Sequence, residues 1–70
     1  MNKKEFGKKV KLARVELNLT QTDLAKKIDS KQKFISRYEN GFSLPSLETL
    51  IKISKALRKN TGYFLDGLVQ

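Results

Sequence analysis

Three side chains on one short polar helix pattern have the clearest chemistry in this chain: Gln32, Lys33 and Arg37. A glutamine amide offers a donor and an acceptor that match an adenine edge, and a lysine can donate to O6 and N7 of guanine. Arg37 follows one turn after Lys33 on the same exposed face, where it could read guanine or hold a phosphate. In an arbitrary helix, Lys33 and Arg37 would be solvated charges and nothing more. Their role therefore depends on the elements that position them.

Two short helical patterns, over residues 21–28 and 31–39, carry these side chains. Thr20 and Asp23 have the spacing of a capping box, and Asn40-Gly41 is typical of a helix end. The inward-facing apolar residues of the two patterns are Leu24, Ala25, Ile28, Ile35 and Tyr38. In many small DNA-binding domains, two helices are joined by a short turn and the second helix has a polar and basic outer face. The domain places this second helix in the major groove of DNA.

Three further helices are predicted over residues 3–17, 46–57 and 61–66. The first has apolar residues at spacings of four, three and four, which form one helical face. The second is the most apolar and is expected to be central. There is no strand pattern, internal repeat or linker. The sequence therefore predicts one all-α domain over residues 1–70, with five helices that include a helix-turn-helix.

Composition restricts the function. The 70 residues include 15 Lys+Arg against 7 Asp+Glu, a net charge of +8, and no Cys or His. This excess of positive charge favours a polyanionic partner, although a soluble basic surface is the simpler alternative. Without Cys or His, the commonest metal ligands and general base are missing. We expect no metal, cofactor, small-molecule ligand or enzymatic activity. The apolar runs are too short for a membrane span or signal peptide, so we expect a cytoplasmic protein.

A longer set of motifs stands in one register along the chain. These residues are Arg14, Leu19-Thr20-Gln21, Leu24-Ala25, Gln32, Ile35 to Gly41, Pro45-Ser46-Leu47, Leu50, Ile53 and Ala56-Leu57. In this order they resemble the lambdoid repressor/Cro-type (XRE-like) helix-turn-helix DNA-binding domains, over about residues 5–65. Two segments depart from that pattern. Asp29-Ser30-Lys31 stands where the family turn usually reads Gly-Val-Ser, and Arg58-Lys59 replaces Gly-Val.

The resemblance implies roles for individual residues. The base-contacting positions are Gln32, Lys33 and Arg37. We add Phe34, which either touches a thymine methyl or a sugar, or packs over Tyr38 or against the turn. Phosphate contacts are expected from Gln21, Lys31, Ser36, Asn40 and Ser43. Arg14 and Glu39 occupy the positions of a partly buried structural ion pair, whose fork geometry suits a guanidinium and a carboxylate.

The resemblance also implies a bacterial or phage transcription regulator. We expect a repressor or controller-type protein that binds a palindromic operator in double-stranded DNA as a homodimer. Leu68 and Val69 are the candidate dimer interface, with a frayed tail as the alternative. A protein-interaction module with the same fold, such as an antitoxin, is the second hypothesis, and the basic residues of the segment 31–39 argue against it. An enzyme is the weakest hypothesis, because the chain has no catalytic motif.

Overall fold

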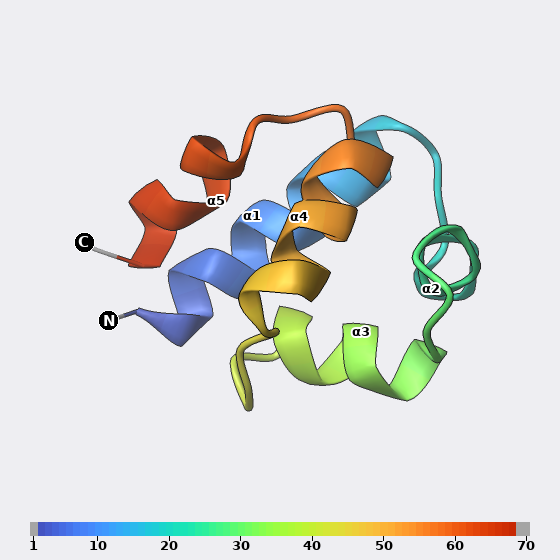
Figure 1. Cartoon of the computed structure of the whole chain (residues 1–70). Helices are drawn as coiled ribbons and strands as arrows, with labels where there is room; N and C mark the ends of the chain where they lie inside the picture. Colours follow the sequence, from blue (N-terminus) through green and yellow to red (C-terminus); the bar gives the residue numbers. More distant parts are fainter. Residues whose placement is uncertain (1, 69–70) are drawn as a thin grey trace.

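The computed structural model describes the backbone of residues 2–68 and the side chains up to Asp66. Five helices follow one another along this part of the chain, which contains no strand (Figure 1). They are α1 (Lys3–Glu16), α2 (Gln21–Lys27), α3 (Gln32–Glu39), α4 (Leu47–Ala56) and α5 (Thr61–Leu68). The predicted all-α class is therefore confirmed.

The observed helix ends differ slightly from the predicted ones, because several residues counted as helical are caps. Leu17, Ile28 and Leu57 cap the C-terminal ends of α1, α2 and α4, so each helix stops one residue earlier than expected. Residues 31 and 46 are extended N-caps rather than first helical residues. A cap takes part in the helical hydrogen bonding while its own backbone lies outside the helical region. At the other end, α5 continues to Leu68 instead of stopping at residue 66.

Four of the helices end in the same backbone motif, in which the residue after the C-cap has a positive φ. The residue is glycine only after α3, at Gly41 with φ 76°. Asn18, Asp29 and Arg58 hold φ values of 57°, 55° and 59°. In each case the next N–H donates to a carbonyl five residues back, as Lys59 does to Ser54 at 3.0 Å and Ser30 to Ala25 at 2.8 Å. This is a Schellman ending, and it explains how Asp29 and Arg58 replace the family's glycines without a change of path.

Arg58→Gly is expected to stabilise the protein, because an L-residue in the left-handed region costs about 1–2 kcal/mol and glycine does not. A gain of about 1 kcal/mol should raise the melting temperature by roughly 4–8 °C in a domain of this size. Thermal denaturation followed by circular dichroism measures it. Arg58→Ala is the matched control, since it removes the same charge and keeps the strain. An equal rise in both variants would assign the gain to charge rather than to φ.

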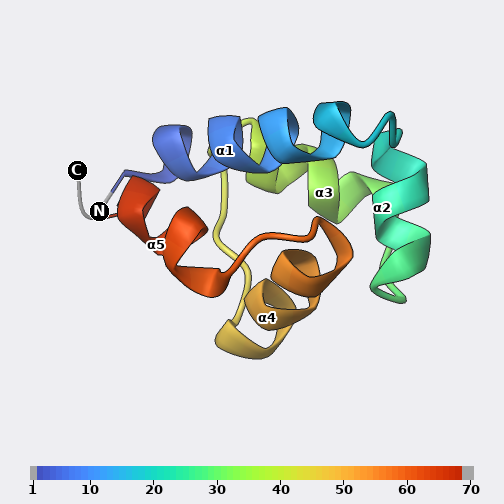
Figure 2. The ribbon, with the colours of Figure 1, turned by 90° about the horizontal axis from the view of Figure 1, so that it is seen from above.

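The core lies between α1 and the other four helices. The fully buried large side chains are Phe6, Val10, Leu24, Ile35, Ile53, Leu57 and Phe64. Phe6 of α1 and Phe64 of α5 meet edge to face, with ring centroids 6.2 Å apart. Figure 2 shows α1 along one side of the molecule, with α3 behind it and α4 and α5 on the other side. The core thus fixes α3 against α1 and α2 and leaves one side of α3 uncovered.

Within the part of the chain that the structure describes, no helix is long and apolar enough to cross a membrane. Over the same residues, no three Asp or Glu side chains gather into a group that could hold a metal ion.

Candidate nucleic-acid interface

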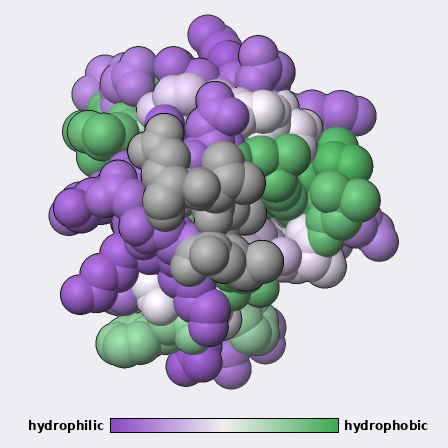
Figure 3. Space-filling model, turned by 90° about the vertical axis from the view of Figure 1, so that its left-hand side faces the viewer, coloured by the Kyte–Doolittle hydropathy of each residue, from purple (hydrophilic) through white to green (hydrophobic). Residues whose placement is uncertain are grey.

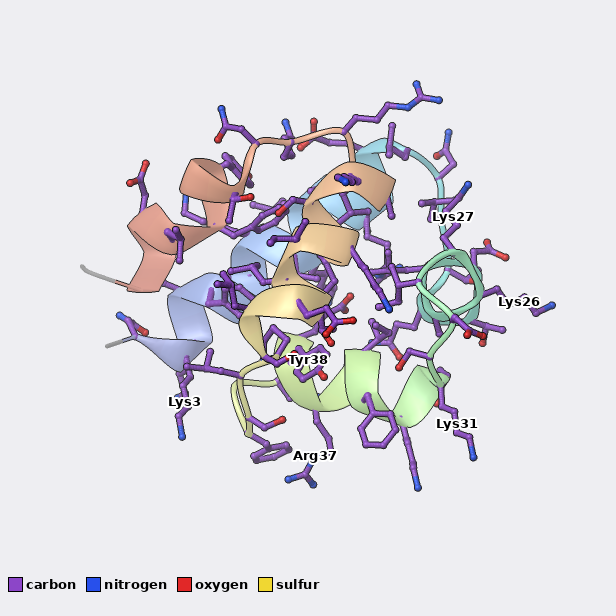
Figure 4. The ribbon with its side chains drawn as sticks, in the orientation of Figure 1. Lys3, Lys26, Lys27, Lys31, Arg37 and Tyr38 are labelled. Atoms are coloured by element: carbon purple, nitrogen blue, oxygen red, sulfur yellow. The ribbon has the colours of Figure 1, made fainter. Side chains whose placement is uncertain are left out.

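The helix α3 lies at an edge of the molecule, where its outer side faces solvent (Figures 1 and 4). Ile35 is fully buried and fixes the inner side, while Gln32, Lys33 and Arg37 are all exposed. In Figure 4, Lys31 and Arg37 extend away from the body of the domain, and Tyr38 lies on its inner side. Since Lys33 and Arg37 are four residues apart, they share one face of the helix. The structure therefore brings the three predicted base-contacting residues onto one exposed surface.

The C-terminal end of α3 rests directly on the backbone of α1 at Gly7. A Cβ atom at Gly7 would lie 2.5 Å from the carbonyl oxygen of Tyr38 and 2.6 Å from that of Glu39. Real Cβ atoms essentially never approach backbone oxygens so closely. Only glycine therefore permits α1 and the end of α3 to pack at this separation. This contact fixes the distance between α1 and the C-terminal end of α3.

A second tie between α1 and α3 is the ion pair of Arg14 and Glu39. Arg14 Nε donates to Glu39 Oε2 at 2.7 Å, and Nη2 donates to Oε1 at 3.0 Å, which makes the contact bidentate. Only 11% of the Arg14 side chain and 3% of the Glu39 side chain are exposed. The hydrogen bonds that Arg14 donates to Glu39 raise the pKa of Arg14, so the guanidinium remains charged. Arg14 Nη1 also donates to the Leu19 carbonyl at 2.7 Å, which anchors the segment before α2.

The ion pair continues into two glutamines that reach the outer face of α3. Gln21 Nε2, at the start of α2, donates to Glu39 Oε1 at 3.0 Å. Gln21 Oε1 in turn accepts a hydrogen bond from Gln32 Nε2. The amide relay, as we call the row Glu39–Gln21–Gln32, therefore connects a buried carboxylate to the first residue of α3. It leaves one N–H and the Oε1 atom of Gln32 free for another partner.

The exposed face of α3 is basic. Its one acid, Glu39, is turned inward to Arg14, whereas Lys33 and Arg37 point outward. Phe34 is exposed, and Lys33 Nζ lies 5.3 Å from the centre of its ring. Within the described residues, Phe34 makes no aromatic contact with Tyr38. The Lys33 ammonium over its ring keeps positive charge beside an apolar surface.

The predicted phosphate-contacting residues surround this face. Gln21 lies at the start of α2, and Lys31 is the extended, exposed N-cap of α3, without a side-chain capping bond. At the other end of α3, Asn40 Nδ2 donates to Ser36 Oγ at 3.2 Å. Ser43 follows in the loop between α3 and α4 and is partly exposed. These residues thus lie at both ends of the basic face.

The remaining predicted site residues fall at the C-terminal end. The backbone of Leu68 belongs to α5, but its side chain and all of Val69 lie outside the described residues. The structure therefore does not place the predicted dimer interface.

Sequence reasoning missed two features of the site, the amide relay and the Gly7 contact. The relay joins Gln21 and Gln32, which are eleven residues apart, and nothing in their spacing indicates that one side chain reaches the other. A signal for the second was present. Glycine is unfavourable inside a helix, so Gly7, beside the apolar face of a predicted helix, indicated a close backbone approach.

The sequence and structure were compared with known proteins. A family described as "Helix-turn-helix" matches residues 10–64. Endothelial differentiation-related factor 1 of Homo sapiens is 42% identical over 53 residues, which cover 76% of this chain and 36% of that protein. An uncharacterised HTH-type transcriptional regulator of Rickettsia conorii is 34% identical over 63 residues, covering 90% of this chain and 50% of the relative. The chain therefore spans between a third and a half of the length of these curated relatives.

Among solved structures, the P22 c2 repressor in complex with a synthetic operator is similar over 89% of this chain and 94% of the repressor. Its TM-score is 0.85 and its sequence identity 31%.

Proposed function

The chain belongs to the helix-turn-helix family of DNA-binding transcription regulators. We propose that it binds double-stranded DNA through α3 and thereby regulates transcription. The family match and the likeness to the P22 c2 repressor confirm the lambdoid repressor resemblance that the motifs indicated. Proteins of this kind are regulators and not enzymes. We further propose that this one acts in the cytoplasm as a repressor or controller on a palindromic operator.

The observation that carries the proposal is the pre-formed, basic outer face of α3. Gln32, Lys33 and Arg37 present donors and acceptors that match base edges, on a helix whose inner side is fixed by Ile35. The amide relay holds Gln32 by one N–H, so that its second N–H and its Oε1 are positioned for N7 and N6 of an adenine. Fixing a side chain before binding lowers the entropy lost in the complex.

Phosphate contacts at the two ends of α3 would set its position in the groove. We propose Gln21 and Lys31 at one end, with Ser36, Asn40 and Ser43 at the other. Contacts of this kind fix the orientation of a protein on DNA and carry no sequence information. Phe34 lies between the two groups and would meet a thymine methyl or a sugar.

The proposal is tested by selecting bound duplexes from a random pool and measuring the affinity of the selected site at several salt concentrations. We expect one preferred sequence and a steep loss of affinity with salt. Each phosphate neutralised contributes about −0.9 to the slope of log K against log salt. A flat salt dependence, or no enrichment of any sequence, would contradict the proposal.

Gln32→Ala and Gln21→Ala should have different consequences, although their side chains touch. Gln32→Ala should relax the preference at one base pair, since a lost bidentate contact costs about 1–3 kcal/mol of discrimination. Gln21→Ala should weaken binding to all sequences, with a smaller loss of preference through its contact with Gln32. Competition assays on single-base operator variants measure both. If Gln21→Ala changed base preference more than Gln32→Ala, α3 would not be the helix in the groove.

We propose that the protein binds as a homodimer through the C-terminal side of the domain. Leu68 and Val69 were predicted for this role, and α4 and α5, which pack together, expose Leu47, Ile51 and Leu65. Figure 3 views the side on which α5 ends and shows apolar surface in green near that end. Two recognition helices must lie about 34 Å apart to enter successive major grooves. The selection above reports the dimer directly, because a dimer selects two inverted half-sites with that spacing.

The protein-interaction module is the alternative function. Several curated relatives are named for bridging, such as multiprotein-bridging factor 1 of Debaryomyces hansenii, which is 45% identical over 51 residues, or 73% of this chain and 34% of that protein. The basic face of α3 favours DNA over this alternative. Lys31, Lys33 and Arg37 together attract a polyanion, and a module that does not bind DNA does not require this concentration of positive charge. A protein partner on another face is compatible with DNA binding by α3.

A further inference from the structure

The outer face of α1 carries two apolar side chains that no other part of the described structure covers. Leu12 is 60% exposed and Val15 is 52% exposed, although both lie within a regular helix. Together with Lys8 and Lys11 they line a shallow hollow of about 400 Å³. These four residues, which we call the α1 patch, recur at helical spacing on the side opposite Phe6, Val10 and Ala13.

The α1 patch is not required by the fold or by the proposed DNA contact. The opposite face of α1 fills the core, and Gly7 and Arg14 of α1 contact the end of α3. Figure 2 shows that α1 has its outer side away from α4 and α5. Single exposed apolar residues are common on protein surfaces. Two adjacent exposed apolar residues flanked by lysines are typical of an interaction surface.

The chemistry of the α1 patch restricts its occupant. A duplex would pair with the lysines but would leave Leu12 and Val15 uncovered by any apolar group. A second copy of this chain would bring Lys8 and Lys11 against their own equivalents, and like charges brought together oppose association. Lys11 makes no ion pair within residues 2–68, and Lys8 has only the exposed Glu5, at 3.5 Å.

We propose that the α1 patch is a docking surface for an acidic amphipathic helix of another protein. Apolar side chains at i, i+3 and i+4 of that helix would cover Leu12 and Val15, and flanking carboxylates would pair with Lys8 and Lys11. The α1 patch lies opposite the buried residues of α1 and shares no residue with the outer face of α3, so the partner and DNA would bind together. The protein would thereby join a second protein to the DNA that it occupies.

The probe is a synthetic helical peptide with leucines at i, i+3, i+4 and i+7 and glutamates at its other exposed positions. The control peptide has the same composition in scrambled order. Each is titrated into the isotope-labelled full chain and followed by amide chemical shifts, with and without excess duplex DNA. We expect the amphipathic peptide to shift residues 8–16 under both conditions, and to bind about tenfold more tightly than the scrambled peptide, because only it presents a continuous apolar face.

Variants separate the patch from general charge attraction. Leu12→Ser with Val15→Ser should weaken peptide binding by tenfold or more, because burying one such side chain contributes about a factor of ten. Phe42→Ser is the matched control, since Phe42 is 68% exposed in the loop between α3 and α4 and should leave peptide binding unchanged. Shifts centred on α3, equal binding of the scrambled peptide, or an equal loss in Phe42→Ser would overturn the proposal. DNA affinity is measured separately, so failure here does not bear on the proposed function.

Discussion

Gly7→Ala is expected to lower the stability of the protein by about 2–3 kcal/mol, even though alanine is the better helix former. The added Cβ would lie 2.5 Å from the Tyr38 carbonyl oxygen and 2.6 Å from that of Glu39. Overpacking costs typically 1–3 kcal/mol and sometimes more, and here the obstacle is backbone that cannot rotate away. The gain in helix propensity, about 1 kcal/mol, offsets only part of this. Thermal melting should show a fall of roughly 10–20 °C.

Gly62→Ala is the control for this prediction, because it makes the same chemical change in another helix. Gly62 is an exposed residue in the first turn of α5, and a Cβ there would meet only the Asn60 Oδ1 atom, at 3.3 Å. That atom belongs to an exposed side chain, which accepts a hydrogen bond from the Tyr63 N–H at 2.9 Å and has to shift by only a few tenths of an ångström. Gly62→Ala should therefore be neutral or slightly stabilising. If Gly7→Ala melted at the same temperature as Gly62→Ala, α1 and α3 would not be in close backbone contact.

The helices and their buried faces could be predicted from the sequence because they depend on local periodicity. The spacing of Phe6, Val10 and Ala13 predicted one buried face, and all three are buried in α1. Thr20 with Asp23 predicted a capping box, which the structure contains, and its hydrogen bond from the Thr20 N–H lowers the pKa of Asp23. Signals of this kind extend over four residues or fewer, so no tertiary information is needed to read them.

The site was predicted less completely, because part of it depends on distances between helices. The Arg14–Glu39 pair was expected from the family pattern alone, and no rule of spacing joins residues 25 positions apart. The amide relay had no counterpart in the prediction. The family pattern assigns Gln21 to a phosphate, yet its side chain contacts Glu39 and Gln32. It retains one N–H for a phosphate, so that assignment remains a proposal.

The turn between α2 and α3 departs from the family pattern in sequence but keeps its backbone path. Lys31 replaces a residue that could cap α3, and no side-chain bond takes its place. The turn keeps its path because Asp29 adopts a φ of 55° and Ser30 donates to Ala25 at 2.8 Å. Backbone hydrogen bonding therefore maintains the turn without the usual side chains.

Arg14→Ala should destabilise the protein by about 3 kcal/mol, because it leaves the carboxylate of Glu39 buried without its cation. Only 3% of the Glu39 side chain is exposed, so water cannot replace the two lost hydrogen bonds. The N–H of Gln21 would remain as a partner, which limits the loss. Lys8→Ala removes the same charge from α1, but its pair with Glu5 is exposed and contributes little. Chemical denaturation of both variants should therefore separate them clearly, and coincident curves would remove the case for the pair.

A double-mutant cycle distinguishes an ion pair from the loss of packing around Arg14. Arg14→Ala with Glu39→Ala should cost less than the sum of the single variants, because the double variant leaves no buried charge alone. The single Arg14→Ala variant should also bind DNA less well than its stability explains. Without Arg14, Glu39 is held by Gln21 alone, so the relay that orients Gln32 is fixed less firmly. Additive costs in the cycle, together with unchanged affinity for the selected operator, would show that the pair neither stabilises the fold nor positions the base-contacting face.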